Sequence, residues 1–158
     1  MSFNIRKGEK SDMPSVLKLI KELAHFENEP DAVIVTVEDL EKDGFGETPL
    51  FKTFVAEQNN EIVGMALFYP RYSTWKGATI HLEDLIVTKS KRGLNIGSAL
   101  YTKVIEYGYN KGVKRIEWVV LDWNTPAIKF YESTGASVLR DWDTAQIHWD
   151  EMKKYLNK

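Results

Sequence analysis

A short segment from Arg92 to Ser98 has the composition of an anion-binding loop. It lies between an apolar run and an amphipathic stretch, so it can aim successive backbone N–H groups and a helix N-terminus at one anion. Gly97 falls in the first helical turn, where a Cβ would obstruct a close approach, and Arg92 adds a positive charge. The segment is neither a Walker loop nor a G-x-G-x-x-G fingerprint. An ordinary strand-to-helix turn with two glycines is the alternative.

Two carboxylates, Glu83 and Asp84, interrupt the apolar run before this loop. Because successive strand residues point to opposite faces, we expect at most one of the two to point into a given cleft. A carboxylate beside a reacting centre can accept a proton or hold an ammonium group. A charge at the sheet edge or in a salt bridge is the alternative, and for a lone glutamate it is the commoner case.

A second polar segment runs from Asp122 to Tyr131. Asn124 suits a helix N-cap, and Pro126 suits the first helical turn. Asn124 and Tyr131 are seven residues apart, close to two turns, so both lie on one stripe of that helix. A phenol on this stripe could protonate a leaving thiolate, whereas a core-facing tyrosine is the alternative.

Hydrophobic periodicity predicts the elements that must position these residues. Strands are expected at residues 3–6, 51–57, 61–72, 79–87 and 115–121, with one or two more within 138–149. Helices are expected from residue 11 or 12 to about 24, from a cap at Thr36 to about 42, from 96 to a cap at Gly112, and at 125–133; turns are expected at 43–46 and 58–60. The order β-α-α-β-β-β-α-β-α-β predicts an α/β fold of the mixed α+β type. We expect one domain over residues 1–158.

Composition excludes several classes of function. The net charge is −2, from 21 basic and 23 acidic residues without a basic stripe, so the chain has no electrostatic footing for nucleic-acid binding. It has no cysteine, which excludes a disulfide, a thiol nucleophile and a thiolate metal site. The three histidines (His25, His81 and His148) lack ligand spacing, so we expect structural or surface roles and no metal.

The sequence also favours a cytoplasmic protein without a membrane partner. Residues 1–10 carry several charges and no apolar core, so they do not resemble a signal peptide. The longest apolar stretch, near residues 62–69, is far too short to span a bilayer.

The loop, the preceding strand and the following helix, in this order, resemble the GNAT superfamily of N-acetyltransferases. Residues Arg92 to Ser98 are similar to its pyrophosphate motif, R/Q-x-x-G-x-G/A, with Asn95 in place of the first motif glycine. Asparagine tolerates positive φ better than other non-glycine residues, so we expect the loop to form.

Further segments are similar to the diamine acetyltransferase family within that superfamily, namely residues 43–47, 72–77, 82–84 and 120–124. The resemblance runs from Ile5 to about Gly135. Tyr-Ser-Thr-Trp-Lys-Gly at 72–77 and Leu-Asp-Trp-Asn at 121–124 look closer to the thialysine branch than to the spermidine/spermine branch. The spermidine/spermine branch has an acidic residue at the position of Ser73, so the resemblance implies a short acceptor, such as thialysine, a related lysine analogue or a small diamine, rather than a long polyamine.

The resemblance implies acetyl-CoA as co-substrate and a mixed, mostly antiparallel sheet flanked by helices, splayed between the fourth and fifth strands. The pantetheine arm would lie in that gap and pair with the backbone like an added strand, and the pyrophosphate would rest on the loop N–H groups. The implied cofactor-binding residues are Leu85, Ile86, Val87, Arg92, Gly93, Leu94, Asn95, Ile96, Gly97, Ser98 and Asn124.

The resemblance also implies direct attack of a neutral amine on the thioester. Glu83 would accept the amine proton, directly or through water, and Tyr131 would protonate the thiolate. Glu27 and Glu83 would hold a cationic acceptor, and Trp75 would supply a wall or a cation–π face. The family implies a homodimer.

Three other functions stay open: a GNAT enzyme for polyamines, a protein N-terminus or an antibiotic amine; a non-catalytic acyl-CoA-binding module; and a purely structural domain. The presence of both Glu83 and Tyr131 favours the enzyme over the last two.

Overall fold

The computed structural model describes residues 2–157, which fall into two units, residues 2–119 and residues 120–157. Each unit is described by itself, and the single domain expected from the sequence stays a prediction. The end residues of that predicted domain, Met1 and Lys158, lie outside the described residues.

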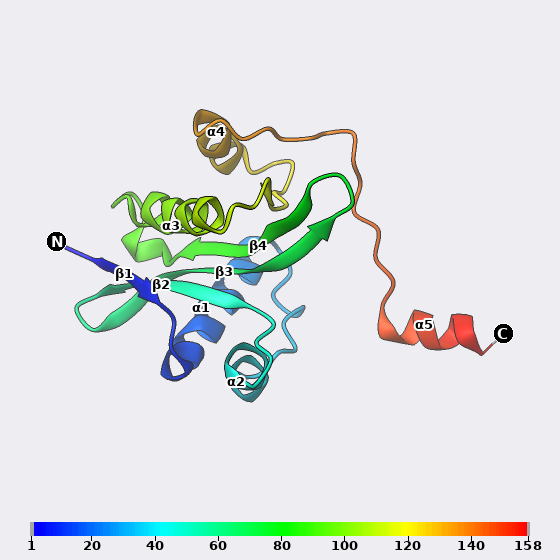
Figure 1. Cartoon of the computed structure of the whole chain (residues 1–158). Helices are drawn as coiled ribbons and strands as arrows, with labels where there is room; N and C mark the ends of the chain where they lie inside the picture. Colours follow the sequence, from blue (N-terminus) through cyan, green and yellow to red (C-terminus); the bar gives the residue numbers. More distant parts are fainter. Residues whose placement is uncertain (1, 158) are drawn as a thin grey trace. The chain divides into compact units, whose positions relative to one another are not determined.

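The first unit is built on a sheet whose strands follow the chain order (Figure 1). The strands are β1 (Asn4–Lys7), β2 (Lys52–Gln58), β3 (Glu61–Ser73), β4 (Gly77–Val87) and β5 (Ile116–Glu117). Neighbours pair antiparallel from β1 to β4, whereas β4 and β5 pair parallel. This arrangement confirms the expected mixed, mostly antiparallel sheet.

The sheet opens between β4 and β5, as expected. Their pairing is limited to Ile80 with Ile116 and His81 with Glu117. The strand expected at 115–121 is therefore much shorter than predicted. A strand exists only where a neighbour supplies its hydrogen bonds, and β5 loses that neighbour after Glu117. The later part of β4 has no β5 partner within the described residues.

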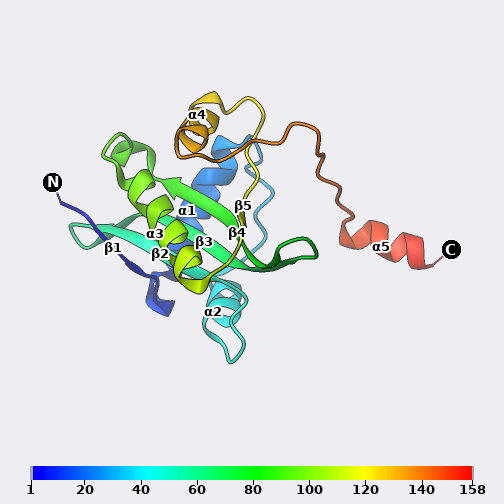
Figure 2. The same ribbon diagram turned by 45° about the horizontal axis from the view of Figure 1, so that its top comes forward.

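Helices cover both faces of this sheet, as Figure 2 shows for α1 (Met13–Phe26) and α3 (Ile96–Lys111). On the α1 face, Met13, Val16 and Leu19 are buried in one cluster with Leu40 of α2 (Val37–Phe45) and with Val55, Met65, Leu67 and Ile86 of the sheet. On the α3 face, Tyr107 packs edge-on against Phe54 and Phe68. The sheet therefore cannot shift without disturbing two buried interfaces.

Local sequence patterns predicted several helix ends correctly. Asp39 N donates to Thr36 Oγ1 at 3.1 Å, and Thr36 N donates to Asp39 Oδ2 at 2.9 Å, which is the expected capping box of α2. This helix continues to Phe45, so the turn expected at 43–46 is instead its last turn. α3 ends at Gly112 with φ 73°, the left-handed cap that the sequence predicts.

The second unit contains α4 (Thr125–Ser133), which matches its predicted bounds, and α5 (Trp149–Leu156). The strands expected within 138–149 are wrong, because no strand is assigned there. Alternation alone cannot make a strand without a pairing neighbour. Acidic residues in the first turn of α5 (Asp150, Glu151) and lysines in its last turn (Lys153, Lys154) suit the helix dipole instead.

None of the helices assigned within residues 2–157 has the length and the apolar composition that crossing a membrane would need.

Candidate active site

The loop before α3 has the backbone conformation that anion binding needs. Gly93 and Asn95 both adopt positive φ, at 79° and 62°. The first turn of α3 contains no acidic residue, and no side chain caps it within the described part of the chain. A Cβ built on Gly97 would meet only Val87 Cγ2, at 3.7 Å. The helix N-terminus therefore presents N–H groups and an open approach, and Asn95 supports the loop as expected.

Arg92 is anchored to the end of β4. Its Nε donates to the carbonyl oxygen of Val87 at 2.9 Å, and its guanidinium lies 5.4 Å from the centre of the Phe26 ring. Glu22 of α1 fixes the segment directly after β4, because it accepts hydrogen bonds from Thr88 Oγ1 at 2.9 Å and from Lys89 N at 2.8 Å. The positive charge at the loop is thus fixed in place, whereas the Val87 carbonyl is already occupied.

A β-bulge lies where the candidate catalytic carboxylate occurs. Leu67 pairs with Asp84 and Phe68 pairs with Leu82, so Glu83 is the additional residue of β4. Such a bulge breaks strict alternation and redirects side chains, and bulges are common beside active sites. The rule that successive side chains of a strand point to opposite faces of the sheet therefore does not hold for Glu83 and Asp84.

Three carboxylates influence one another around the bulge. Burial, followed by the charges of Glu83 and Glu27, raises the pKa of Asp84 to about 6. Burial, followed by the charge of Glu83, raises the pKa of Glu27 above its ordinary value. Glu27 directly follows α1, which brings it from a distant part of the sequence. Clustered carboxylates repel one another, so a cation bound among them is favoured.

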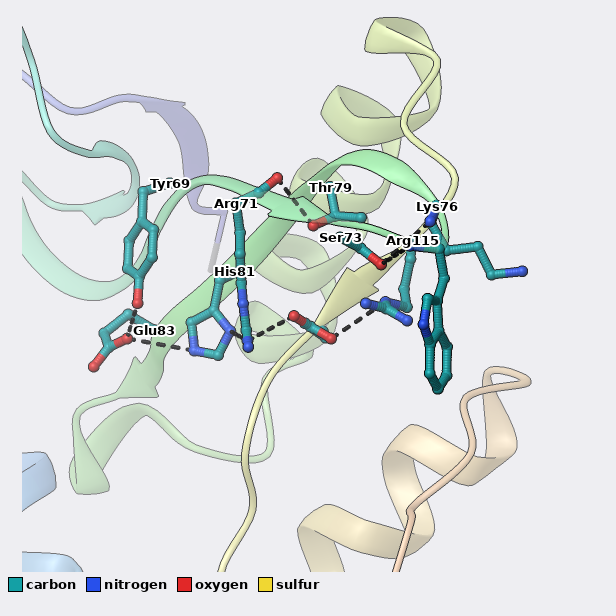
Figure 3. A network of polar contacts seen from close by, with 10 residues as sticks. Tyr69, Arg71, Ser73, Lys76, Thr79, His81, Glu83 and Arg115 are labelled. Carbon is teal, nitrogen blue, oxygen red and sulfur yellow. Dashed lines mark hydrogen bonds and ion pairs between the residues drawn. The ribbon is translucent and has the colours of Figure 1, made fainter. Parts of the chain in front are cut away.

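Glu83 is held by neighbours on the same face of the sheet (Figure 3). Tyr69 Oη donates to its Oε2 at 2.7 Å, and His81 Nε2 lies 3.4 Å from the same oxygen. Tyr69 and His81 face each other in the β3–β4 register. Burial, followed by the hydrogen bond to Glu83, raises the pKa of Tyr69 to about 12, so the phenol stays protonated and donates.

The contact with Arg71 determines which ring nitrogen of a neutral His81 carries the proton. Arg71 Nη1 lies 3.4 Å from His81 Nδ1. A guanidinium only donates, so Nδ1 accepts and a neutral His81 carries its proton on Nε2, toward Glu83. Oε2 of Glu83 thus faces two donors, whereas Oε1 accepts no hydrogen bond from residues 2–157.

The remaining predicted residues lie in two places. Trp75 is 77% exposed in the β3–β4 hairpin, where Ser73 Oγ accepts from Trp75 N and Lys76 N at 3.1 and 3.2 Å. Asn124 takes the N-cap position of α4, but its side chain makes no capping bond to described residues. Tyr131 lies inside α4. Because Asn124 and Tyr131 belong to the second unit, their approach to Glu83 stays a prediction.

The sequence alone did not place Tyr69, His81 or Glu22 in this region, and it singled out Asp84 only as the neighbour of Glu83. Tyr69 and His81 gave a usable signal, because an alternating hairpin places polar residues of both strands on one face. The bulge gave no signal, since it depends on how β3 and β4 pair. No group of His, Asp or Glu suited to a metal ion occurs among the described residues.

Comparison with known proteins finds similarity to acetyltransferases. A model of the acetyltransferase (GNAT) family matches residues 15–136. The chain is 38% identical to a thialysine N-epsilon-acetyltransferase of Bos taurus, over 98% of this chain and 97% of that protein. It is also 38% identical to a spermidine/spermine N(1)-acetyltransferase-like protein 1 of Homo sapiens, over 85% of this chain and 20% of that protein.

Solved structures share the fold. An aminoglycoside N-acetyltransferase in complex with CoA superposes with a TM-score of 0.73 at 19% identity, over 92% of this chain and 95% of that chain. At this identity the likeness concerns the fold alone.

The carboxylate cluster gives a prediction that needs no substrate. In Glu83→Gln, the pKa of Asp84 should fall from about 6 because one neighbouring negative charge is lost. It should stay above its ordinary value, since burial is the larger cause. Titration of the side-chain carboxyl carbon by NMR measures this shift.

Glu29→Gln is the matched control, because it removes an exposed carboxylate from the loop that carries Glu27. It should leave the pKa of Asp84 unchanged. An Asp84 titration that is the same in the wild-type protein and in Glu83→Gln would show that the two carboxylates do not interact.

Proposed function

The chain belongs to the acetyltransferase (GNAT) family, and we propose that it transfers the acetyl group of acetyl-CoA to the terminal amine of a small cationic acceptor, such as thialysine or a related lysine analogue. The observation that carries this proposal is the position of Glu83. Its carboxylate is fixed by Tyr69 and His81 beside the carboxylates of Glu27 and Asp84.

The loop before α3 fits the pyrophosphate of CoA. The α3 N-terminus lacks a capping side chain within residues 2–157, and a Cβ at Gly97 would occupy space that the fold leaves open. Backbone N–H groups from Gly93 to Ser98, with the charge of Arg92, would hold the phosphates. Leu85 and Ile86 lie where β4 has lost its β5 partner, and with Val87 and Asn124 they are the proposed contacts of the rest of the cofactor.

Acetyl-CoA, when bound, supplies the activated acetyl group. The attacking amine must be neutral, although an ordinary alkylammonium has a pKa of about 10.4. Glu83 accepts the excess proton on Oε1, directly or through water, while Tyr69 and His81 hold its Oε2. Tyr131 donates its phenolic proton to the leaving sulfur. Glu27, with Trp75 as a wall, holds the cationic acceptor.

We propose a homodimer as the working form. Residues 139–156 expose several large apolar side chains: Leu139, Trp142, Ile147, Trp149, Tyr155 and Leu156. A second copy of the chain would cover them, in keeping with the dimers of the family. The cytoplasmic location stays a prediction, to be tested by cell fractionation.

Acceptor choice tests the proposed activity directly. Ser73 uses its hydroxyl to accept two turn N–H groups and supplies no charge, so a remote ammonium of a polyamine gains no ion pair there. Steady-state rates with acetyl-CoA, read as released CoA, should give a higher kcat/KM for thialysine than for spermidine or spermine. Ser73→Asp should shift that ratio toward the polyamines. A wild-type preference for spermine would refute the acceptor, and no turnover with any amine would refute the transferase.

The cofactor loop is tested at Gly97. Gly97→Val should weaken acetyl-CoA binding by more than about tenfold, because the branched side chain enters the approach to the backbone N–H groups. Asn95→Gly is the matched control and should bind as well as the wild-type protein, since glycine also adopts the positive φ of this position. Calorimetry measures both affinities. Unchanged affinity of a folded Gly97→Val variant would remove the loop from the cofactor site.

The proton donor is tested at Tyr131. Tyr131→Phe removes only the phenolic oxygen, so kcat should fall by about 10²-fold while the affinity for acetyl-CoA changes little. Tyr109→Phe removes an exposed phenol from α3 and should retain the wild-type kcat. If Tyr131→Phe keeps a near wild-type kcat, another group protonates the sulfur.

A further inference from the structure

The polar network around Glu83 continues past His81 to a second charged cluster (Figure 3). Arg71 Nη1 lies 2.6 Å from Oε1 of Glu117, and Arg115 Nε lies 3.2 Å from Oε2 of the same glutamate. These residues come from β3, β5 and the residue before β5. Two guanidinium groups share one carboxylate, so the cluster keeps one unbalanced positive charge. We call Arg71, Arg115 and Glu117 the arginine–glutamate cluster.

Two atoms of this cluster are buried without a hydrogen bond. Arg115 Nε and Glu117 Oε1 are both sealed from solvent, and neither makes a bond of hydrogen-bond geometry within the described residues, although both lie in ion-pair contact. Buried polar groups normally find such a partner. The side chain of Arg71, in contrast, is 54% exposed, so a ligand can reach the cluster from its side.

The spacing between the cluster and Glu83 is short. One imidazole ring, with a contact of 3.4 Å at each nitrogen, separates the Glu83 carboxylate from the Arg71 guanidinium. This separation is comparable with that between the terminal amine and the α-carboxylate of a lysine-like amino acid. A molecule lying along this row therefore meets a carboxylate at one end and a mixed, net positive cluster at the other.

We propose that the arginine–glutamate cluster is the subsite for the α-carboxylate and α-ammonium groups of an amino acid whose terminal amine is acetylated beside Glu83. The exposed guanidinium of Arg71 pairs with the α-carboxylate, Arg115 adds positive charge beside it, and the negative charge of Glu117 attracts the α-ammonium. A polyamine has no carboxylate, and it would place a second cation against two guanidinium groups, so the cluster rejects it by repulsion. This inference rests on the proposed function and specifies the acceptor as a zwitterionic amino acid.

The test compares two acceptors that differ by one group: thialysine and its decarboxylated form, the diamine bis(2-aminoethyl) sulfide. The wild-type protein should have a higher kcat/KM for thialysine. Arg71→Gln should lower kcat/KM for thialysine by about tenfold or more, mainly through KM, and should leave it unchanged or raise it for the diamine, because the repulsion of the second ammonium is relieved. Arg71→Lys keeps the charge and should recover part of the thialysine rate.

Lys76→Gln is the matched control, since it removes another exposed cation from the same hairpin, and it should alter neither rate. An equal loss for both acceptors in Arg71→Gln would show that Arg71 only braces the sheet, and equal wild-type rates would show that no carboxylate is recognised. Either result overturns the subsite and leaves the acetyltransferase intact. Wild-type protein that acetylates neither acceptor nor any other amine would overturn the proposed function, and the subsite with it.

Discussion

The extra residue in β4 is the constraint on which the candidate site depends. β3 and β4 pair on both sides of the bulge, and α1 and α3 pack on the two faces of the sheet. The bulge at Glu83 therefore cannot be removed by sliding one strand, because a one-residue slip would turn the whole apolar set of that strand to the wrong face. Its consequence is local: the carboxylates of Glu83 and Asp84 interact with each other and with Glu27, which comes from the end of α1.

This clustering of carboxylates destabilises the folded state, and it favours the binding of a cation. Burial is the larger cause of the raised pKa values of Asp84 and Glu27, and the repulsion among the three neighbouring carboxylates adds to it. Donors from Tyr69 and His81 stabilise the charge on Glu83 without neutralising it. The negative charge of the three carboxylates is therefore not neutralised within the fold, and a bound cationic acceptor gains a favourable electrostatic interaction with it. On the other side of His81, Arg71 carries a positive charge. The site therefore has a negative end at Glu83 and a positive end at Arg71.

The parts that sequence predicted are those governed by local rules. Thr36 and Asp39 form their capping box, Gly112 ends α3, Asn95 adopts positive φ, and α4 has its expected bounds. The parts that sequence missed depend on distant partners. β5 shortens because β4 leaves it, residues 138–148 form no strand because no neighbour pairs with them, and the bulge at Glu83 arises from the register with β3. Family resemblance made Glu83 a candidate, whereas only the structure shows which side chains contact it.

The pH dependence of kcat/KM in Glu83→Gln tests the central claim most directly, because this change keeps the shape of the side chain and removes its charge. With thialysine as acceptor, the rate loss in this variant should be greatest at low pH, where the amine carries its proton most fully and needs a base to remove it. Asp84→Asn in the same assay separates loss of the base from a general loss of negative charge. A Glu83→Gln profile that coincides with the wild-type profile over the whole pH range would contradict the account and leave Glu83 a structural residue.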